Sequence, residues 1–195
     1  MFFGMSNEIQ IDREGRALII RFKQPEIRNP LSITVLEQVD LLVDSCDGGV
    51  ERLIFTGTGN AFASGADLRE ITTVTAESAR EFALRGQILM TKIESLRQTT
   101  IAAINGYCFG GALDLALACD RRIASPSASF AHPGTGLGII TGWGGTQRLP
   151  RLIGTAFSNE LLFTASPITA DLALKIGLVD VIADDPLAAA LSRDN

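Results

Sequence analysis

Two glycine-rich turns in the sequence have the composition needed to bind a developing negative charge. Residues 63–69 have the sequence Ala-Ser-Gly-Ala-Asp-Leu-Arg, and residues 105–112 have the sequence Asn-Gly-Tyr-Cys-Phe-Gly-Gly-Ala. Each turn lies between a strand-like segment and a helical segment. N–H groups that enter a helix have no intrahelical acceptor and can hold an anion. Two of them on one carbonyl oxygen would stabilise an enolate or a tetrahedral oxyanion, although each turn alone fits a simple strand-to-helix connection.

Two side chains outside the turns could transfer protons. Asp114 lies in an otherwise apolar helical segment, where an ionised carboxylate is costly without partners. This favours a functional group, and the alternative is a hydrogen-bonded structural aspartate. His132 is the only histidine and could act as a base near neutral pH. Strand alternation places it on the same face as Phe130, so a buried structural histidine is its alternative.

Composition restricts both the class of protein and its partners. The 195 residues are 46% hydrophobic and 20% charged, which indicates one packed globular domain. A net charge of −5 without a basic run argues against nucleic acid as a partner. The most apolar window, residues 99–119, is interrupted by Asn105, two glycine clusters and Asp114, so no membrane partner is expected.

Several cofactor chemistries are also disfavoured. Residues 57–59 lack the third glycine of a dinucleotide-binding fingerprint, and no P-loop motif is present. One histidine and no calcium-type acidic cluster predict no metal site. The three cysteines, Cys46, Cys108 and Cys119, form no C-x-x-C pair, which favours a reduced, cytoplasmic setting.

The elements that must position these residues alternate between strands and helices, which predicts an α/β fold with active groups on loops at strand ends. Strands are expected at residues 8–12, 17–22, 52–56, 101–104, 122–125, 128–130 and 178–182. Helices are expected from the N-cap Ser32 to Gly48-Gly49, at 76–96 and 110–119, and at 145–153, 155–164 and 170–176. Residues 57–65 and 133–145 are expected to be loops.

Five segments in this order resemble the enoyl-CoA hydratase/isomerase (crotonase) superfamily. They are residues 61–70, residues 104–107 with the following Gly110-Gly111, residues 118–120 (Ala-Cys-Asp), residues 144–149 (Gly-Gly-Thr-Gln-Arg-Leu) and residues 171–181. The resemblance implies a spiral of ββα units, a trimer or a dimer of trimers, and an acyl-CoA thioester substrate. Coenzyme A would then be part of the substrate, with no permanently bound cofactor.

The resemblance also implies roles for individual residues. The backbone N–H groups of Ala66 and Gly111 correspond to the family's oxyanion hole. Basic groups near the coenzyme A phosphates correspond to Arg28 and Arg69, for which a solvated arginine is the alternative. The remaining coenzyme A contacts would come from the first turn, at Ala63, Gly65, Asp67 and Leu68.

Two departures from the family pattern limit what can be expected. Hydratases of the family use two glutamates, and these positions correspond to Asp114 and Gly134, so ordinary two-carboxylate hydration is not expected. Decarboxylation, isomerisation and thioester hydrolysis remain open, as does a non-catalytic acyl-CoA-binding protein. A serine hydrolase would need Ser64, which lacks a Gly-x-Ser-x-Gly elbow.

The second departure is length. The expected core domain spans residues 1–183, and residues 184–195 form a short tail in place of the family's C-terminal helices. The pocket would then be more open or be covered by another chain, or the protein would have lost catalysis.

Overall fold

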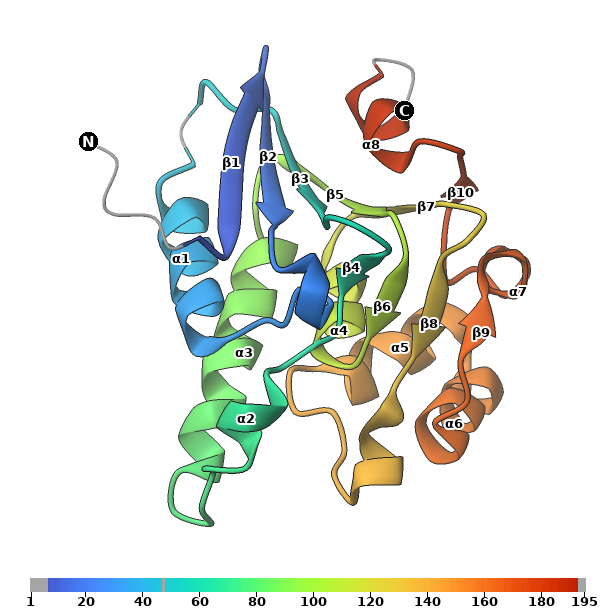
Figure 1. Ribbon diagram of the computed structural model, residues 1–195. Helices are drawn as coiled ribbons and strands as arrows, with labels where there is room; N and C mark the ends of the chain where they lie inside the picture. The colour runs from blue at the N-terminus through green and yellow to red at the C-terminus, as the bar shows by residue number, and fades with distance from the viewer. Residues whose placement is uncertain (1–6, 47, 193–195) are drawn as a thin grey trace.

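The computed structural model describes residues 7–46 and 48–192, and its larger sheet has six strands (Figure 1). Its strands are, in spatial order, β1 (Ile9–Glu14), β2 (Ala17–Phe22), β3 (Arg52–Thr56), β5 (Thr99–Ile104), β7 (Arg121–Ala124) and β10 (Val181–Ile182). The predicted hairpin forms β1 and β2, and Gly15 in its turn has φ +58°. The other neighbouring pairs are parallel, as expected for alternating strands and helices.

A second sheet of four very short strands lies beside the first, and most of it was not predicted. Its order is β4 (Ala61–Ala63), β6 (Tyr107–Phe109), β8 (Ser129–Ala131) and β9 (Ile168–Thr169). The strands β4, β6 and β8 run parallel to one another, whereas β9 is antiparallel. Each of β3, β5 and β7 continues into one of the three parallel strands and then toward a helix. This repetition is the ββα spiral that the family resemblance implied.

Helices pack against the strands of both sheets (Figure 1). The α-helices are α1 (Ile33–Asp44), α2 (Leu68–Ile71), α3 (Ala79–Glu94), α4 (Gly111–Ala118), α5 (Gly145–Ile153), α6 (Thr155–Thr164), α7 (Ala170–Lys175) and α8 (Pro186–Leu191). Two 3-10 turns, η1 (Pro25–Ile27) and η2 (Pro133–Leu137), lie in connecting loops. Helix α4 has little amphipathic character, and its residues 112–118 are all buried. It therefore carries Asp114 into the interior.

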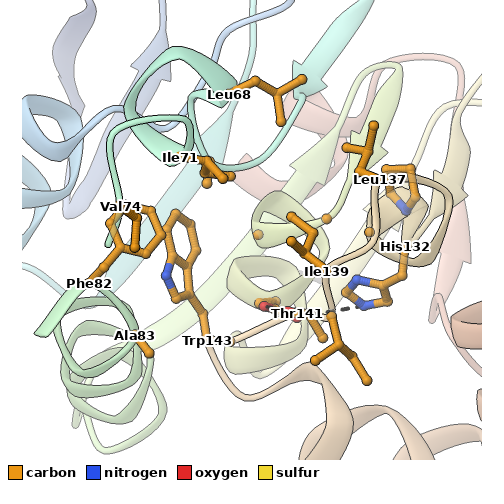
Figure 2. A pocket seen from close by; sticks show the side chains of 18 of the residues that line it. Leu68, Ile71, Val74, Phe82, Ala83, His132, Leu137, Ile139, Thr141 and Trp143 are labelled. Atoms are coloured by element: carbon orange, nitrogen blue, oxygen red, sulfur yellow. Dashed lines mark hydrogen bonds and ion pairs between the residues drawn. The ribbon is translucent and has the colours of Figure 1, made fainter. Parts of the chain in front are cut away.

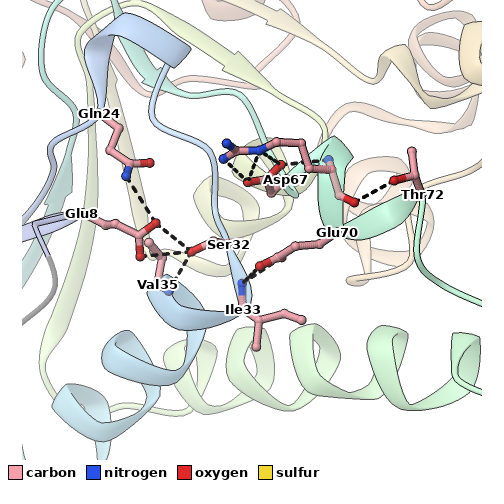
Figure 3. A network of polar contacts seen from close by, with 9 residues as sticks. Glu8, Gln24, Ser32, Ile33, Val35, Asp67, Glu70 and Thr72 are labelled. Carbon is pink, nitrogen blue, oxygen red and sulfur yellow. Dashed lines mark hydrogen bonds and ion pairs between the residues drawn. The ribbon is translucent and has the colours of Figure 1, made fainter.

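The start of α1 is tied to the segment that follows the first glycine turn. Ser32 caps the helix by accepting a hydrogen bond from Val35 N at 3.1 Å, as its residue type predicts. The carboxylate of Glu70 in α2 accepts from Ile33 N at 2.9 and 3.1 Å (Figure 3). The Glu8 carboxylate accepts from Ser32 Oγ in the same network. These contacts fix α2, and with it the end of the first turn, against α1.

Part of the expected tail is a structured helix. Helix α8 packs on β5 and β7, and its Ala190 is fully buried against the face of the large sheet. Arg52 Nη1 donates to the carbonyls of Ala190, Leu191 and Ser192 at 2.8–3.0 Å. The sequence pattern was weak there because α8 is short and alanine-rich. The last part of the expected tail, residues 193–195, lies outside the described residues.

Candidate active site

The small sheet determines where the two glycine turns and His132 lie. The carboxyl ends of parallel strands meet at one edge of a sheet, where ligands commonly bind in α/β proteins. Strand β4 ends at Ala63 and leads into the first turn, and β8 ends at Ala131 just before His132. Strand β6 lies within the second turn, which was expected to be irregular, and ends at Phe109 just before Gly110-Gly111. Pairing of β4 with β6 and of β6 with β8 therefore brings all three segments together.

The two glycine turns are in direct contact. Gly65 has φ +93°, and a Cβ there would lie 2.7 Å from the Phe109 carbonyl oxygen and 2.8 Å from the Gly111 nitrogen. Only glycine fits this position without displacing the second turn. Leu31 N donates to the Gly65 carbonyl at 2.8 Å, which holds the first turn.

The second turn is anchored to β8 by Gly110 N, which donates to the Ala131 carbonyl at 2.9 Å. Gly111 is the first residue of α4, so its N–H has no acceptor inside the helix. The N–H of Gly111 therefore lies at the contact between the two turns.

All four residues predicted to act in catalysis line one cavity, which has a volume of about 290 Å³. Ala66 and Gly111 contribute the turns, Asp114 comes from α4, and His132 follows β8. The rest of the lining is mostly apolar and comes from α2, α3 and the loop before α5 (Figure 2). Its larger side chains are Leu68, Ile71, Val74, Phe82, Leu137, Ile139, Ile140 and Trp143.

The residues predicted to contact coenzyme A are more dispersed. Leu68 lines the cavity and is 54% exposed, whereas Ala63 is fully buried in β4. The carboxylate of Asp67 caps α2 and pairs with the exposed Arg69 guanidinium at 2.6 Å. That guanidinium lowers the pKa of Asp67. Arg28 lies over the ring of Tyr107 at 5.1 Å, with its backbone at φ +61°. Their roles toward coenzyme A stay predictions.

Asp114 is fully buried, and its two carboxylate oxygens have different surroundings. Thr141 Oγ1 donates a hydrogen bond to Oδ2, and Oδ1 lies 3.6 Å from His132 Nε2. Burial raises the pKa of Asp114 to about 7, and the hydrogen bond from Thr141, the polar backbone of Trp143 and Gly145 and the charge of Arg148 oppose that rise. At neutral pH both the acid and the base form of Asp114 are therefore populated.

His132 is 2% exposed, and neither ring nitrogen has a hydrogen-bond partner within the described chain. Ser64 lines the same cavity but is not hydrogen bonded to this ring. Burial lowers the pKa of His132 to about 4, so the imidazole is neutral at pH 7. At pH 7 a neutral imidazole therefore lies beside a carboxyl that is partly protonated.

These pKa shifts predict opposite pH dependences of stability. Asp114 is more basic in the fold than its ordinary value of 3.8, so its stabilising contribution is complete below pH 4 and is lost as pH rises toward 7. His132 is less basic than its ordinary value of 6.5, so its contribution is lost as pH falls from 6.5 to 4.

Urea unfolding of wild type and Asp114→Asn between pH 4 and 7 isolates the first contribution. The unfolding free energy of wild type should fall relative to that of the variant by about 4 kcal/mol as pH rises over this range. The reason is that the pKa of Asp114 is about three units higher in the folded chain than in the unfolded chain. A difference that does not change with pH would mean that Asp114 is not buried as an acid.

Trp143 and Thr141 are site residues that sequence reasoning did not identify. A Cβ at Gly86 of α3 or at Gly111 of α4 would enter the space of the Trp143 ring, so both glycines are needed for the indole to pack between these helices. The Phe82 ring lies 6.1 Å from it. Gly86 in a helix interior was the available signal, because such a glycine often marks a close approach.

Gly134 is the residue that the family resemblance places at the second hydratase glutamate, and the structure leaves little room for a side chain there. A Cβ at Gly134 would lie 2.8 Å from the Ile139 carbonyl oxygen. The cavity therefore contains one carboxyl group, that of Asp114, together with the His132 imidazole.

Two features of the described chain concern metals and membranes. Among residues 7–46 and 48–192, no three His, Cys, Asp or Glu side chains are grouped closely enough to bind a metal ion. No helix in that part of the chain has the length and apolar character of a membrane span.

Comparisons with known proteins identify the class to which this fold and cavity belong. Residues 12–191 match the family model described as enoyl-CoA hydratase/isomerase. The chain therefore belongs to the enoyl-CoA hydratase/isomerase family, and its fold is the crotonase fold.

Individual relatives agree with this family. A short-chain-enoyl-CoA hydratase of Clostridium acetobutylicum is 38% identical over 181 residues, which cover 91% of this chain and 69% of the relative. A crotonyl-CoA hydratase of Syntrophomonas wolfei is 41% identical over 177 residues, covering 89% of this chain and 68% of the relative. The crystal structure of an enoyl-CoA hydratase from Bacillus anthracis has a TM-score of 0.86 at 38% identity and covers 90% of this chain and 70% of that one. The chain thus spans somewhat more than two thirds of these relatives.

Proposed function

We propose that the protein binds acyl-CoA thioesters and stabilises an enolate with the backbone N–H groups of Ala66 and Gly111. The observation that carries the proposal is the contact between the two glycine turns at the cavity that also contains Asp114. Hydrogen-bond donors fixed in a cavity with little water stabilise developing charge more strongly than donors in water. A thioester carbonyl placed between these N–H groups would become a better electron sink, and its α-proton would become more acidic.

Asp114 is the proposed acid and base. Its pKa of about 7 suits a group that must take up and return a proton at neutral pH. In an isomerisation, the carboxylate removes a proton from the α-carbon of a 3-enoyl chain, and the electrons move into the thioester to form an enolate. The same carboxyl then returns the proton to the γ-carbon as the enolate collapses. One carboxyl completes this cycle without a second carboxylate.

Hydration is the second candidate, because His132 Nε2 lies 3.6 Å from Asp114 Oδ1. The neutral imidazole can accept a proton from a water molecule that adds to the β-carbon while Asp114 protonates the α-carbon. The pair would then replace the two carboxylates of the family's hydratases. The similarity to a short-chain-enoyl-CoA hydratase and to a crotonyl-CoA hydratase also supports this candidate.

Purified protein tested with three substrate classes separates the candidates. Crotonyl-CoA loses its conjugated double bond on hydration, 3-enoyl-CoA gains one on isomerisation, and a malonyl-type thioester releases carbon dioxide on decarboxylation. Turnover of an enoyl-CoA is the expected result. A protein that binds acyl-CoA but neither converts the acyl chain nor releases free coenzyme A would be a non-catalytic binding protein. That result would contradict the proposal.

Coenzyme A would be held near the first turn, and its phosphates would lie near Arg28 and Arg69. Arg28 supports this role because an exposed cation is kept in place by the Tyr107 ring. Arg69 already pairs with Asp67 and would have to bind a phosphate in addition.

We further propose that the protein forms a homo-oligomer and is located in the cytoplasm. Exposed apolar side chains such as Phe163 and Leu41, and three cysteines that form no C-x-x-C pair, support these two statements.

A further inference from the structure

Thr141 reaches the buried carboxyl of Asp114 from a loop whose next two residues are held by α3 and α5. Its hydroxyl donates to Asp114 Oδ2, and its side chain also lines the cavity. Next to it, Gln87 Nε2 of α3 donates to the Gly142 carbonyl at 2.7 Å. The carbonyl of Trp143, two residues after Thr141, accepts from Arg148 of α5 at 3.3 Å. Arg148 also pairs with Glu94 of α3 at 2.8 Å. The backbone that follows Thr141 is thus fixed to α3 and α5.

The hydrogen bond from Thr141 makes the two oxygens of Asp114 inequivalent. Oδ2 is occupied by the hydroxyl, whereas Oδ1 has no hydrogen-bond partner within the described residues. A Cβ at Gly145 would collide with Oδ1, so the start of α5 closes that side of the carboxyl. The side toward His132 remains available for proton exchange.

We propose that Thr141 is a positioning residue that binds Asp114 Oδ2 and presents Oδ1 to the substrate and to His132. The inference rests on the proposed function, because it assigns the orientation of the same acid and base. A carboxyl that rotates freely would present a proton or a lone pair in the wrong direction for part of the time, and misorientation of a catalytic group lowers the rate of proton transfer.

The charge state of Asp114 should depend on the same contact. A hydroxyl donor favours the ionised carboxylate, so removal of the donor raises the pKa of Asp114 further. The other groups near this carboxyl are His132 after β8, Arg148 of α5 and the backbone of Trp143 and Gly145, and the last three lower its pKa. The buried thiol of Cys108 in β6 has its own pKa raised in part by Asp114. None of these changes when Thr141 alone is replaced.

The test compares Thr141→Val, which keeps the shape but removes the hydroxyl, with Thr141→Ser, which keeps the donor. Thr135→Val is the matched control, since Thr135 Oγ1 donates to the Leu162 carbonyl away from Asp114. With the enoyl-CoA that wild type converts, Thr141→Val should lower kcat by about 10- to 100-fold with KM nearly unchanged. It should also move the acidic limb of the kcat profile to higher pH. Thr141→Ser and Thr135→Val should stay close to wild type.

A second measurement does not need turnover. In protein with ¹³C-labelled aspartate carboxyls, the pKa of Asp114 should rise in Thr141→Val and remain near the wild-type value in Thr141→Ser. An unchanged pKa and rate in Thr141→Val, or equal losses in the Val and Ser variants, would overturn the role of Thr141. Absence of turnover by wild type with every acyl-CoA, with the pKa shift intact, would instead contradict the proposed function.

Discussion

Asp114→Asn should lower kcat for an enoyl-CoA by about 10²- to 10⁴-fold, the contribution usual for a general acid or base. Asparagine has nearly the same shape and can still accept the hydrogen bond from Thr141, but it cannot take up or release the proton. Steady-state kinetics with the wild-type substrate measures the loss.

KM should change little in this variant, because Asp114 acts on the reacting carbons and not on coenzyme A. Asp171→Asn on the exposed start of α7 is the control and should keep wild-type activity. Activity within a few-fold of wild type in Asp114→Asn would show that the buried carboxyl has a structural role only.

Gly65→Ala is expected to be nearly as damaging, through the backbone and not through a lost functional group. The added methyl would be placed against the Phe109 carbonyl and the Gly111 nitrogen, and the φ of +93° disfavours any side chain. The two turns must then separate. Because the loss of one oxyanion donor costs about 10²- to 10³-fold in kcat, a decrease of this size is expected.

Gly15→Ala provides a matched comparison for that substitution. Gly15 also has positive φ, +58°, but a Cβ there meets no atom within 4 Å, and the residue lies in the β1–β2 hairpin turn. It reproduces the backbone strain without affecting the cavity, so its kcat should equal that of wild type. Equal losses of activity in both variants would point to general destabilisation and not to the geometry of the turns.

The large sheet and the long helices were predictable because each has a pattern of its own. The α1 pattern of buried Val35, Val39 and Val43 after the cap Ser32 is an example, and it agrees closely with the helix found. The small sheet was not predictable in this way. Strands of two or three residues, such as β4, β6 and β9, are too short to show alternation.

This omission matters for the site, because pairing within the small sheet is what brings the turns together. The side chains with chemistry, Asp114 and His132, were found from residue type, and the structure places them in one cavity. Thr141 and Trp143 were missed because they lie in a glycine-rich loop without periodicity. Their positions depend on contacts with Gln87 and Gly86 of α3, which are distant in sequence.

The most direct test of the account is a crystal structure of the protein with acetoacetyl-CoA. The thioester oxygen should lie about 2.7–3.1 Å from both the Ala66 nitrogen and the Gly111 nitrogen, with the carbons next to the carbonyl facing Asp114. A thioester oxygen bound elsewhere, or in contact with only one of these two nitrogens, would contradict the proposed stabilisation of an enolate.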